Sequence, residues 1–263
     1  MYDLATRRRA LDLLAQGRSL NSVSQLTGAS RSAIRTWREH PEPRAPSHVC
    51  SRCGPDPQPP SDRVAYAYLL GLYLGDGCIS RQPRTHVMRI ACSDTWPGLI
   101  TTCETAMRAV RPANRISRVP KQGCVMVSSY SNHWLCLFPQ HDRGKKHERA
   151  IVLEPWQQAI VRAHPWPFIR GLIHSDGCRV VNWTTKVVGG ERKRYEYPRY
   201  FFSNKSDDIR ALFTDALRMV GVEWTVLARG ADPFNVSIAR RRPWRSWTPM
   251  SVRSSERPAR YSP

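Results

Sequence analysis

The sequence has no long apolar run, and nothing in it approaches the ~18–20 residues that a membrane-spanning helix requires. The amino-terminal stretch MYDLATRRRALDLL also lacks the extended apolar segment of a secretory signal peptide. These two absences argue against a membrane-spanning or secreted protein. We therefore expect a cytoplasmic protein, associated with the nucleoid if its source is bacterial.

Acidic residues are scarce. The 263 residues include 21 Asp and Glu against 41 Lys and Arg, which gives a net charge of +20. Such an excess predicts a polyanionic partner, most often nucleic acid, with an anionic membrane surface as the alternative. The length is sufficient for a substantial core and a smaller appended domain.

Paired cysteines are also few. Eight cysteines are scattered along the chain, and without a secretion signal we expect reduced thiols rather than disulfides. The single Cys-x-x-Cys motif, Cys50 and Cys53, supplies half of a tetrahedral zinc site. His48 or a distant cysteine would have to complete it, so zinc at this pair is an alternative to a metal-free linker.

Residues 1–40 carry a helical pattern. The apolar spacing predicts a helix over residues 4–16 and two short helices on either side of Gly28. We expect Val23 and Leu26 to face inward on the first of these short helices. Ser30 is placed to cap the next one.

That last helix carries the chemistry of the segment. Ile34 and Trp37 are spaced to anchor it, which leaves Arg31, Ser32 and Arg35 on its outer face. The pattern resembles a helix-turn-helix module of the transposase or resolvase type, in which such a helix enters the DNA major groove. The alternative is a small helical bundle with a solvated basic face.

After a proline-rich linker at residues 41–62, the sequence repeats itself. The stretch LLGLYLGDG at 69–77 returns 100 residues later as IRGLIHSDG at 169–177. Each copy reads as an apolar helix that ends in Asp-Gly and is followed by strands, a helix and further strands.

The repeat predicts two halves, residues 63–165 and 166–247, followed by a basic tail at 248–263. Each half has the expected order αββαββα, so the fold class is α+β with a small all-α module in front. We expect helices over 64–75, 96–110, 168–175 and 207–222, and strands near 78–84, 85–94, 114–120, 123–131, 178–188, 197–205, 223–229 and 234–241.

Small residues recur at helical spacing in both copies. Gly71 and Gly75 are four apart in the first, and Gly171 and Ser175 are four apart in the second. Small residues at this spacing clear one face of a helix and allow another backbone to approach closely. The two helices are therefore expected to pack against each other.

This packing would bring Asp76 beside Asp176, and we expect Gly77 and Gly177 to close the helices in the left-handed conformation. Each carboxylate would then lie at the negative end of a helix dipole, which costs ~0.3–1 kcal/mol. A divalent cation reverses that penalty and the mutual repulsion, and carboxylate ligands suit Mg²⁺ or Mn²⁺. Such a pair on a basic surface favours metal-assisted phosphodiester hydrolysis. The alternative is that each Asp-Gly is only a turn after a core helix.

The two copies closely resemble the LAGLIDADG homing endonuclease family in its single-chain, two-motif form, over roughly residues 62–245. Both keep the helix glycine, the final Asp and its Gly, while Leu74 and His174 stand where the family often has an acidic residue. The resemblance implies a monomer with internal pseudo-two-fold symmetry, whose paired sheets form a saddle in the major groove of double-stranded DNA. It also implies that Asp76 and Asp176 are the catalytic metal ligands.

The resemblance implies further catalytic groups that steer water and stabilise charge. The polar positions after the second strand match Ser93 and Asp94 in one half, and Asn204 and Lys205 in the other. The lysine after the last helix matches Lys145 or Lys146 in the first half only. The alternative for this lysine pair is a basic loop.

Outward basic residues on the strands and hairpins support the saddle independently, because β-ribbons fit the major groove and arginine can grip guanine or phosphate. The alternative for each is a solvated surface charge. The candidates are Arg81, Arg84, Arg89, Arg118, Lys121, Arg179, Lys186, Arg192, Lys193, Arg194, Arg199, Arg240 and Arg242.

The sequence therefore predicts a site-specific, metal-dependent double-strand DNA endonuclease of the homing type. The runner-up is a non-cleaving DNA-binding regulator built on the same fold, and an RNA maturase is a third alternative. We do not expect an intein, because the chain begins with Met and ends in Ser-Pro without a terminal His-Asn.

Overall fold

The computed structural model describes residues 4–41, 59–142, 144–229 and 232–239. The chain divides into two units, Met1–Ser51 and Arg52–Pro263, each with its own hydrophobic core. Several predicted site residues lie outside the described residues: Cys50, Cys53, Arg240 and Arg242. The same holds for most of the linker and for the basic tail.

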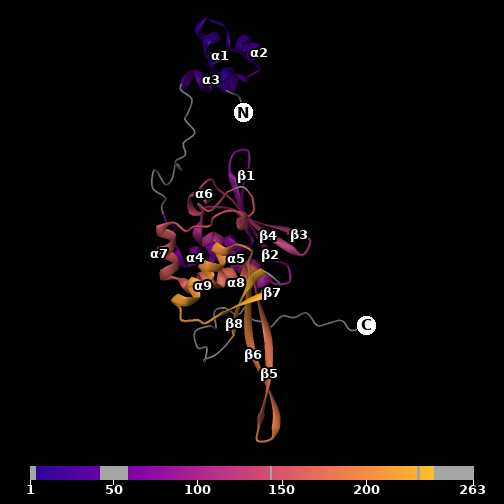
Figure 1. The fold of residues 1–263 in the computed structure, drawn as a ribbon. Coiled ribbons are helices and arrows are strands. Elements are labelled where there is room, and N and C mark those ends of the chain that lie inside the picture. Colours follow the sequence, from indigo (N-terminus) through magenta and orange to yellow (C-terminus); the bar gives the residue numbers. More distant parts are fainter. Residues whose placement is uncertain (1–3, 42–58, 143, 230–231, 240–263) are drawn as a thin grey trace, which may run out of the picture. The chain divides into compact units, whose positions relative to one another are not determined.

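The N-terminal unit consists of α1 (Leu4–Ala15), α2 (Leu20–Thr27) and α3 (Arg31–Glu39) (Figure 1). Gly28 ends α2 in the left-handed conformation, with φ of 69°. The Ser30 hydroxyl caps α3 by accepting a hydrogen bond of 3.2 Å from the Ala33 amide. The three helices predicted for this segment are thus present, with the predicted turn and cap.

One side chain of this unit differs from expectation. Val23 is fully buried, but Leu26 is 49% exposed. Three positions along a helix rotate a side chain by about 60° from its neighbour on the same face. The core of this unit is small, and its buried members include Ala10 and Ile34. The rotation therefore places the Leu26 side chain at the edge of that core.

The first half of the second unit contains, in order, α4 (Arg63–Asp76), β1 (Gly77–Arg81), β2 (His86–Ser93), α5 (Pro97–Val110), β3 (Ile116–Lys121), β4 (Cys124–Tyr130) and α6 (Trp134–Leu137). A short 3₁₀ helix, η1 (Lys146–Glu148), and α7 (Pro155–Ala163) connect it to the second half. That half contains α8 (Pro165–Asp176), β5 (Gly177–Val188), β6 (Glu191–Ser203), α9 (Asp207–Met219), β7 (Thr225–Arg229) and β8 (Asp232–Ala239).

The two halves have the same sheet topology. Each contains an antiparallel four-stranded sheet, in the order β1-β2-β4-β3 in one and β5-β6-β8-β7 in the other. The predicted α+β fold with two similar halves is confirmed through β8, where the described residues end. None of the described helices has the length and apolar character that crossing a bilayer would require.

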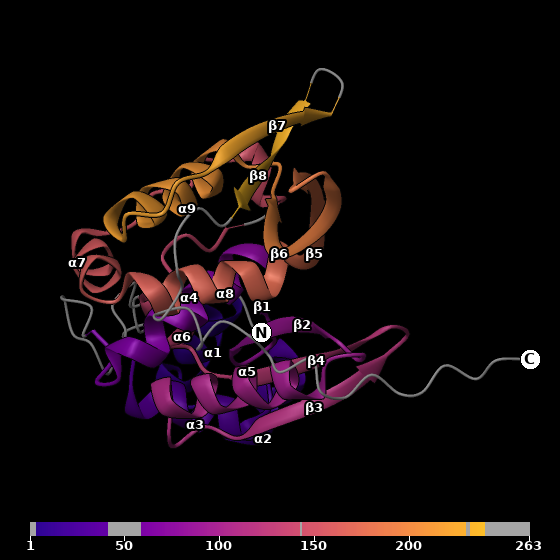
Figure 2. The same ribbon diagram turned by 90° about the horizontal axis from the view of Figure 1, so that it is seen from below.

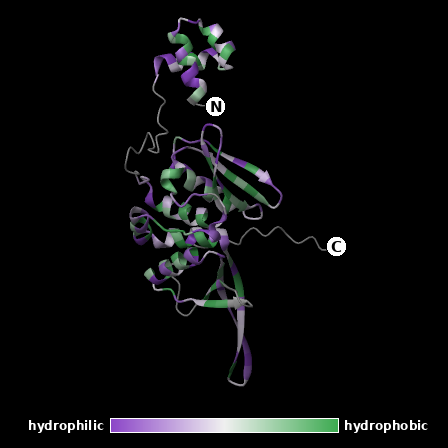
Figure 3. Cartoon of the chain, turned by 45° about the horizontal axis from the view of Figure 1, so that its top comes forward, coloured by the Kyte–Doolittle hydropathy of each residue, from purple (hydrophilic) through white to green (hydrophobic). Residues whose placement is uncertain are grey.

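The helices α4 and α8 lie side by side at the centre of the unit. Seen from below, one sheet with α5 lies on one side of this pair, and the other sheet with α9 lies on the opposite side (Figure 2). The central helices are among the apolar parts of the chain in Figure 3, which fits their burial. Burial on all sides explains why α4 has no polar stripe.

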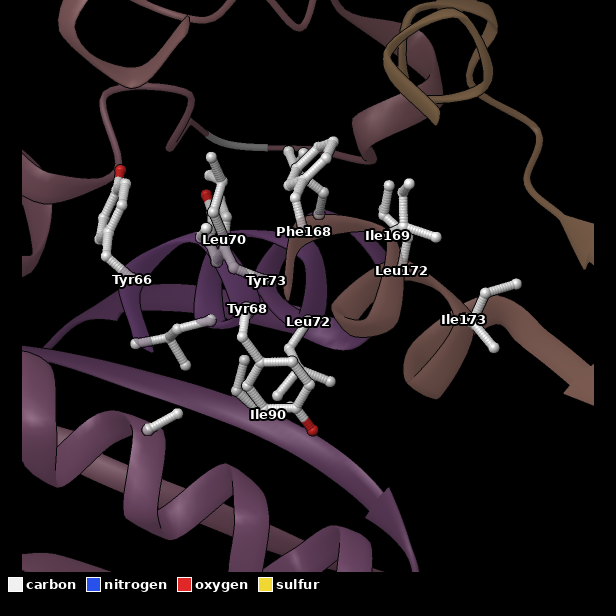
Figure 4. Packing of buried hydrophobic residues seen from close by; sticks show 14 of the residues in the cluster. Tyr66, Tyr68, Leu70, Leu72, Tyr73, Ile90, Phe168, Ile169, Leu172 and Ile173 are labelled. Carbon is white, nitrogen blue, oxygen red and sulfur yellow. The ribbon is translucent and has the colours of Figure 1, made fainter. Parts of the chain in front are cut away.

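Side chains leave α4 in two directions. Tyr68 and Leu72 point toward Ile90 of the first sheet, whereas Tyr66 and Tyr73 point to the opposite side (Figure 4). All of them are buried. The helix α4 therefore packs into two layers of the core at once. This packing fixes the position of the helix and of its last residue, Asp76.

The strand β6 begins six residues earlier than predicted, at Glu191 rather than Tyr197. The segment ERKRYE carries no apolar alternation, so no buried face marks it as a strand. It is extended because it pairs with β5 from Val188 back to Trp183. The resulting β5–β6 hairpin extends well beyond the rest of its sheet (Figure 1).

Candidate functional site

The central helices touch at their small residues, as the spacing predicted. A Cβ on Gly71 would lie 2.5 Å from the Phe168 carbonyl oxygen, and one on Gly171 would lie 2.2 Å from the Tyr68 carbonyl oxygen. At Gly75 a Cβ would lie 2.1 Å from the Ser175 hydroxyl oxygen. No side chain larger than hydrogen fits these positions without separating the helices.

This contact brings the two helix ends together, and the last residues of α4 and α8 are Asp76 and Asp176. A Cβ on Gly75, the neighbour of Asp76, would lie 3.0 Å from Asp176 Oδ2. The structure thus gathers the two predicted catalytic carboxylates at one place. Each lies at the C-terminal end of its helix, where the dipole disfavours negative charge.

The prediction for the following glycines is wrong. Gly77 and Gly177 have φ of −89° and −107°, so neither is left-handed. The chain passes directly from each helix into a strand, which requires extended backbone. Glycine is needed for space instead, because a Cβ on Gly77 would lie 2.5 Å from Tyr73 Cα and one on Gly177 would lie 2.6 Å from the Ile173 carbonyl oxygen.

The surroundings of Asp76 make its carboxyl group harder to ionise. Its side chain reaches solvent, yet the surrounding protein removes much of its hydration. This desolvation and the negative charge of Asp176 together raise its pKa to about 6, against the opposing effect of the Lys146 cation. A cation placed between the carboxylates would relieve the desolvation and the repulsion together.

Asp176 has a different environment. Desolvation raises the pKa of its carboxyl group, while the Asn204 amide and the Lys146 cation lower it. The Asn204 side chain donates a hydrogen bond of 2.5 Å to Asp176 Oδ2. The two carboxylates are therefore equivalent in sequence but not in their partners.

Lys146 lies at the end of α4. Its ammonium group donates hydrogen bonds to the carbonyl oxygens of Tyr73, Leu74 and Gly75, at 2.5, 3.1 and 2.8 Å. The Leu74 and Gly75 carbonyls belong to the last turn of the helix, which leaves them without intrahelical partners, whereas the Tyr73 carbonyl also accepts a hydrogen bond from the Gly77 N–H. Burial lowers the Lys146 pKa to about 8, although both aspartates act to raise it.

A cavity of about 460 Å³ opens beside the carboxylate pair. Asp176 and Asn204 line it, together with the predicted lysines Lys145, Lys146 and Lys205. Lys145 is exposed and forms an ion pair of 3.1 Å with Glu148. Arg149 lines the cavity beside these three lysines, and the acidic residues of the lining are Asp142 and Asp176.

The donor set suits a hard cation that keeps part of its own hydration. Within the described ranges, no three His, Cys, Asp or Glu side chains gather into a metal cluster. Two carboxylates beside an open cavity are the protein contribution that Mg²⁺ commonly receives, with water and substrate phosphate completing its coordination. Asp76 and Asp176 would hold such an ion.

The polar residues predicted for the first half do not occupy the position that Asn204 has in the second half. Asn204 lies two residues beyond Phe202, the cross-strand partner of Gly177, and the residue with the same register in the first half is Cys92. Cys92 is buried, and Ser93 instead bonds to the Thr95 hydroxyl at 2.7 Å. In the described chain, no side-chain amide donates to Asp76.

Strand alternation separates the predicted basic residues into two groups. On β2, Met88 and Ile90 face the helices, so Arg89 lies on the open face of the sheet. The residues with open-face register are Arg89, Lys121, Lys186, Lys193 and Arg199. Those with helix-face register are Arg81, Arg118, Arg179, Arg192 and Arg194, and Arg84 lies in the connection between β1 and β2.

Arg118, which has helix-face register, contacts the helix that covers its sheet. Its guanidinium binds Glu104 of α5, with 2.8 Å from Nε to Oε2. This ion pair ties the sheet to the helix that covers it, so Arg118 does not contribute to the open face.

In the N-terminal unit, Arg31, Ser32 and Arg35 are exposed, while Ile34 is buried.

The sequence interpretation missed two residues that shape the site. Arg149 donates hydrogen bonds to the carbonyl oxygens of Asp142, Gly144 and Gln140, and so folds the loop that carries Lys146. His174 bonds through Nδ1 to the Tyr68 hydroxyl at 2.9 Å, which joins α8 to α4. The only signal for His174 was its unusual place in the repeated motif.

No family model matches the chain, and no curated protein matches it in sequence. Among solved structures, the chain is similar to I-DmoI in complex with DNA and Mn, at 15% identity and a TM-score of 0.41, with 67% of this chain and 89% of that chain covered. A double mutant of I-SmaMI matches at 9% identity and a TM-score of 0.41, over 66% and 79% of the two chains.

The N-terminal LAGLIDADG domain of WhiA matches at 13% identity and a TM-score of 0.40, over 68% of this chain and 76% of that one. The structural neighbours of the chain are thus LAGLIDADG proteins, which include both the homing endonuclease I-DmoI and WhiA.

Proposed function

We propose that this protein is a metal-dependent endonuclease that cuts both strands of duplex DNA. The observation that carries the proposal is the meeting of Asp76 and Asp176 at the ends of two touching helices, beside a cavity lined by lysines. Two desolvated carboxylates that repel each other destabilise a protein unless a cation joins them. A structural role would not require this arrangement.

Duplex DNA is the substrate that suits the surroundings of the pair. The open faces of both sheets carry Arg89, Lys121 and Arg199, and β-ribbons of this kind fit the major groove. A net charge of +20 supplies attraction to the phosphate backbone. Because both halves are in one chain, a monomer would contact both halves of its site.

Bound by Asp76 and Asp176, Mg²⁺ or Mn²⁺ would polarise a phosphate oxygen and lower the pKa of bound water. The protein residues supply the rest. Asn204 orients Asp176 through its amide, and Lys146 adds a positive charge near both carboxylates. Lys205 lies on the wall of the cavity, within reach of a phosphate that enters it.

The N-terminal unit would add a second contact with DNA. The residues on the exposed face of α3, Arg31, Ser32 and Arg35, have the placement of a recognition helix. A helix-turn-helix there would lengthen the recognised sequence. It would serve a nuclease or a regulator equally.

The competing function is a DNA-binding regulator that does not cleave. One observation favours it: Lys146 already places a cation beside the carboxylates, so the pair is partly neutralised without metal. The two functions are separated by incubating the full chain with a plasmid library in Mg²⁺ and in EDTA. Linear plasmid in Mg²⁺ alone supports the nuclease, whereas retained circles that still bind the protein support the regulator.

A further inference from the structure

The hairpins of the two sheets differ greatly in length. In the first half, β1 runs only four residues from Gly77, beside the carboxylate pair, to Arg81. In the second, β5 runs eleven residues from Gly177 to Val188. At ~3.4 Å per residue, β5 reaches about 24 Å further from the carboxylates than β1.

Among the described residues, the extra length is a two-stranded ribbon. The described part of β8 pairs with β6 from Arg199 to Ser203, and within the described ranges residues 181–198 pair with each other alone. Gly189 and Gly190 close the ribbon with φ of 63° and 84°, the combination of a type I′ turn. An isolated hairpin is at best marginally stable in water, which suggests that a partner supports it.

The open face of the ribbon is positively charged, which indicates a negatively charged partner. Lys186 and Lys193 are directly opposite each other across the strands, on the open face of the sheet. Like charges in this position repel and destabilise a hairpin. Among the described residues neither lysine forms an ion pair, although Arg194 beside them pairs with Glu196 at 2.7 Å.

The other face is stiffened by its own contacts. The Arg194 guanidinium stacks over the Trp183 ring, 4.9 Å from its centroid, and the Glu196 ion pair holds it there. These contacts link the strands near the middle of the ribbon. On the open face, Glu191 is the nearest acidic residue in register, and among the described residues it forms no ion pair with either lysine.

We propose that the β5–β6 ribbon makes a one-sided extension of the DNA contact, in which Lys186 and Lys193 together bind backbone phosphate far from the carboxylate pair. The inference rests on the proposed DNA-binding function and adds an asymmetry to it. Lys186 is nine residues beyond Gly177, which at ~3.4 Å per residue and ~3.4 Å per base pair corresponds to about nine base pairs. The first hairpin would end after about four.

The test uses a duplex recovered from a random-sequence library by the full chain, and hydroxyl-radical footprinting of the complex. A shortened ribbon is made by removing residues 185–188 and 191–194. Thr184 and Tyr195 are already cross-strand partners, so the Gly189–Gly190 turn can close directly on them. The footprint should retreat by about four base pairs at one end and stay unchanged at the other.

A second variant keeps the ribbon intact. Lys186→Gln with Lys193→Gln should lower the slope of log Kobs against log salt by about one to two. The matched control is Arg108→Gln with Arg218→Gln, which removes the same charge from α5 and α9 and should leave the slope unchanged. Both controls lie on the helix side, where they pair with Glu104 and Asp215.

The outcomes separate this inference from the function on which it rests. A full chain that recovers no duplex overturns both. A chain that binds and cuts, but keeps its footprint after shortening or its salt slope after the lysine substitutions, overturns only the one-sided contact. Loss of a protein–protein complex on shortening, with an unchanged footprint, would assign the ribbon to a protein partner instead.

Discussion

Asn204 donates a 2.5 Å hydrogen bond to Asp176, and within the described chain Asp76 has no equivalent amide partner. The cation that acts on Asp76 is Lys146. Its positive charge lowers the pKa of Asp76, whereas desolvation raises that pKa. Lys146 therefore supports both carboxylates, whereas only Asp176 also has an amide donor. This difference makes Lys146 the residue whose removal should affect the site most selectively.

Lys146→Met should reduce DNA cleavage by about 10²-fold, because it removes a fixed cation from the place where negative charge develops. It should also move the acid limb of the pH profile to higher pH, since Lys146 lowers the pKa of both aspartates. The measurement is the single-turnover cleavage rate between pH 5 and pH 9.

The neighbouring lysine provides the control. Lys145 is exposed and paired with Glu148, so Lys145→Met should change the rate by no more than about threefold. Equal losses in the two variants would mean that general basicity of the loop matters, and not the position of Lys146.

The carboxylate pair should cost stability in the absence of metal. The pKa of Asp76 is about 6 when folded, above its value of about 3.9 in an unfolded chain. A carboxyl group with a raised pKa contributes full stability below the unfolded pKa, and that stability is lost as pH rises through the folded pKa. Asp76→Asn should therefore stabilise the protein by about 1 kcal/mol at pH 7.5 in EDTA, after allowance for solvent screening.

Urea unfolding at pH 7.5 and at pH 4 tests this directly. The difference in the free energy of unfolding between parent and variant should shrink toward zero at the lower pH, where Asp76 is protonated in the folded parent and about half protonated in the unfolded chain. A variant that is less stable than the parent at pH 7.5 would show that the Asp76 carboxylate makes a favourable contact.

The contact between α4 and α8 should tolerate no side chain at Gly171. Because a Cβ there would lie 2.2 Å from the Tyr68 carbonyl oxygen, Gly171→Ala should destabilise the protein by about 3 kcal/mol or more. Gly221→Ala is the control, since its φ of 67° strains alanine but its surroundings are open. That control should cost only about 1 kcal/mol, measured by the same unfolding transition.

The exposed arginines of α3 should add affinity for DNA. Replacing Arg31 and Arg35 by Ala should weaken binding about tenfold or more at moderate salt, since each removes a DNA contact. Arg8→Ala with Arg9→Ala removes two exposed charges from α1 of the same unit and should weaken binding less. If both double variants bind alike, α3 is not a recognition helix.

Much of this structure follows from local sequence. Small residues four apart in each copy, Gly71 with Gly75 and Gly171 with Ser175, predict the contact of the central helices. That contact explains why Asp76 and Asp176 meet. Such features can be predicted because small residues at helical spacing and residues at a helix end occur in few structural contexts. Most helices and strands of both halves follow from apolar periodicity in the same way, whereas α7 and the first six residues of β6 do not.

Other features depend on tertiary geometry that no local pattern encodes. Gly77 is needed for clearance from Tyr73 and not for a left-handed turn, which becomes apparent only once the next strand is in place. The capping of α4 by Lys146 joins residues more than 70 positions apart. The side of the sheet on which Arg118 lies was likewise set by register, and not by its charge.

The most direct test of the central claim is strand cleavage by Asp76→Asn and Asp176→Asn, each compared with the parent on one selected duplex in Mg²⁺. The carboxylates are proposed to supply chemistry and not affinity, so each variant should lose double-strand cleavage by about 10³-fold or more. Each should still bind the duplex within about threefold of the parent, or slightly more tightly, because one anion near a phosphate is gone. Undiminished cleavage by both variants, or a parent that cuts no duplex in Mg²⁺ or Mn²⁺, would contradict the account.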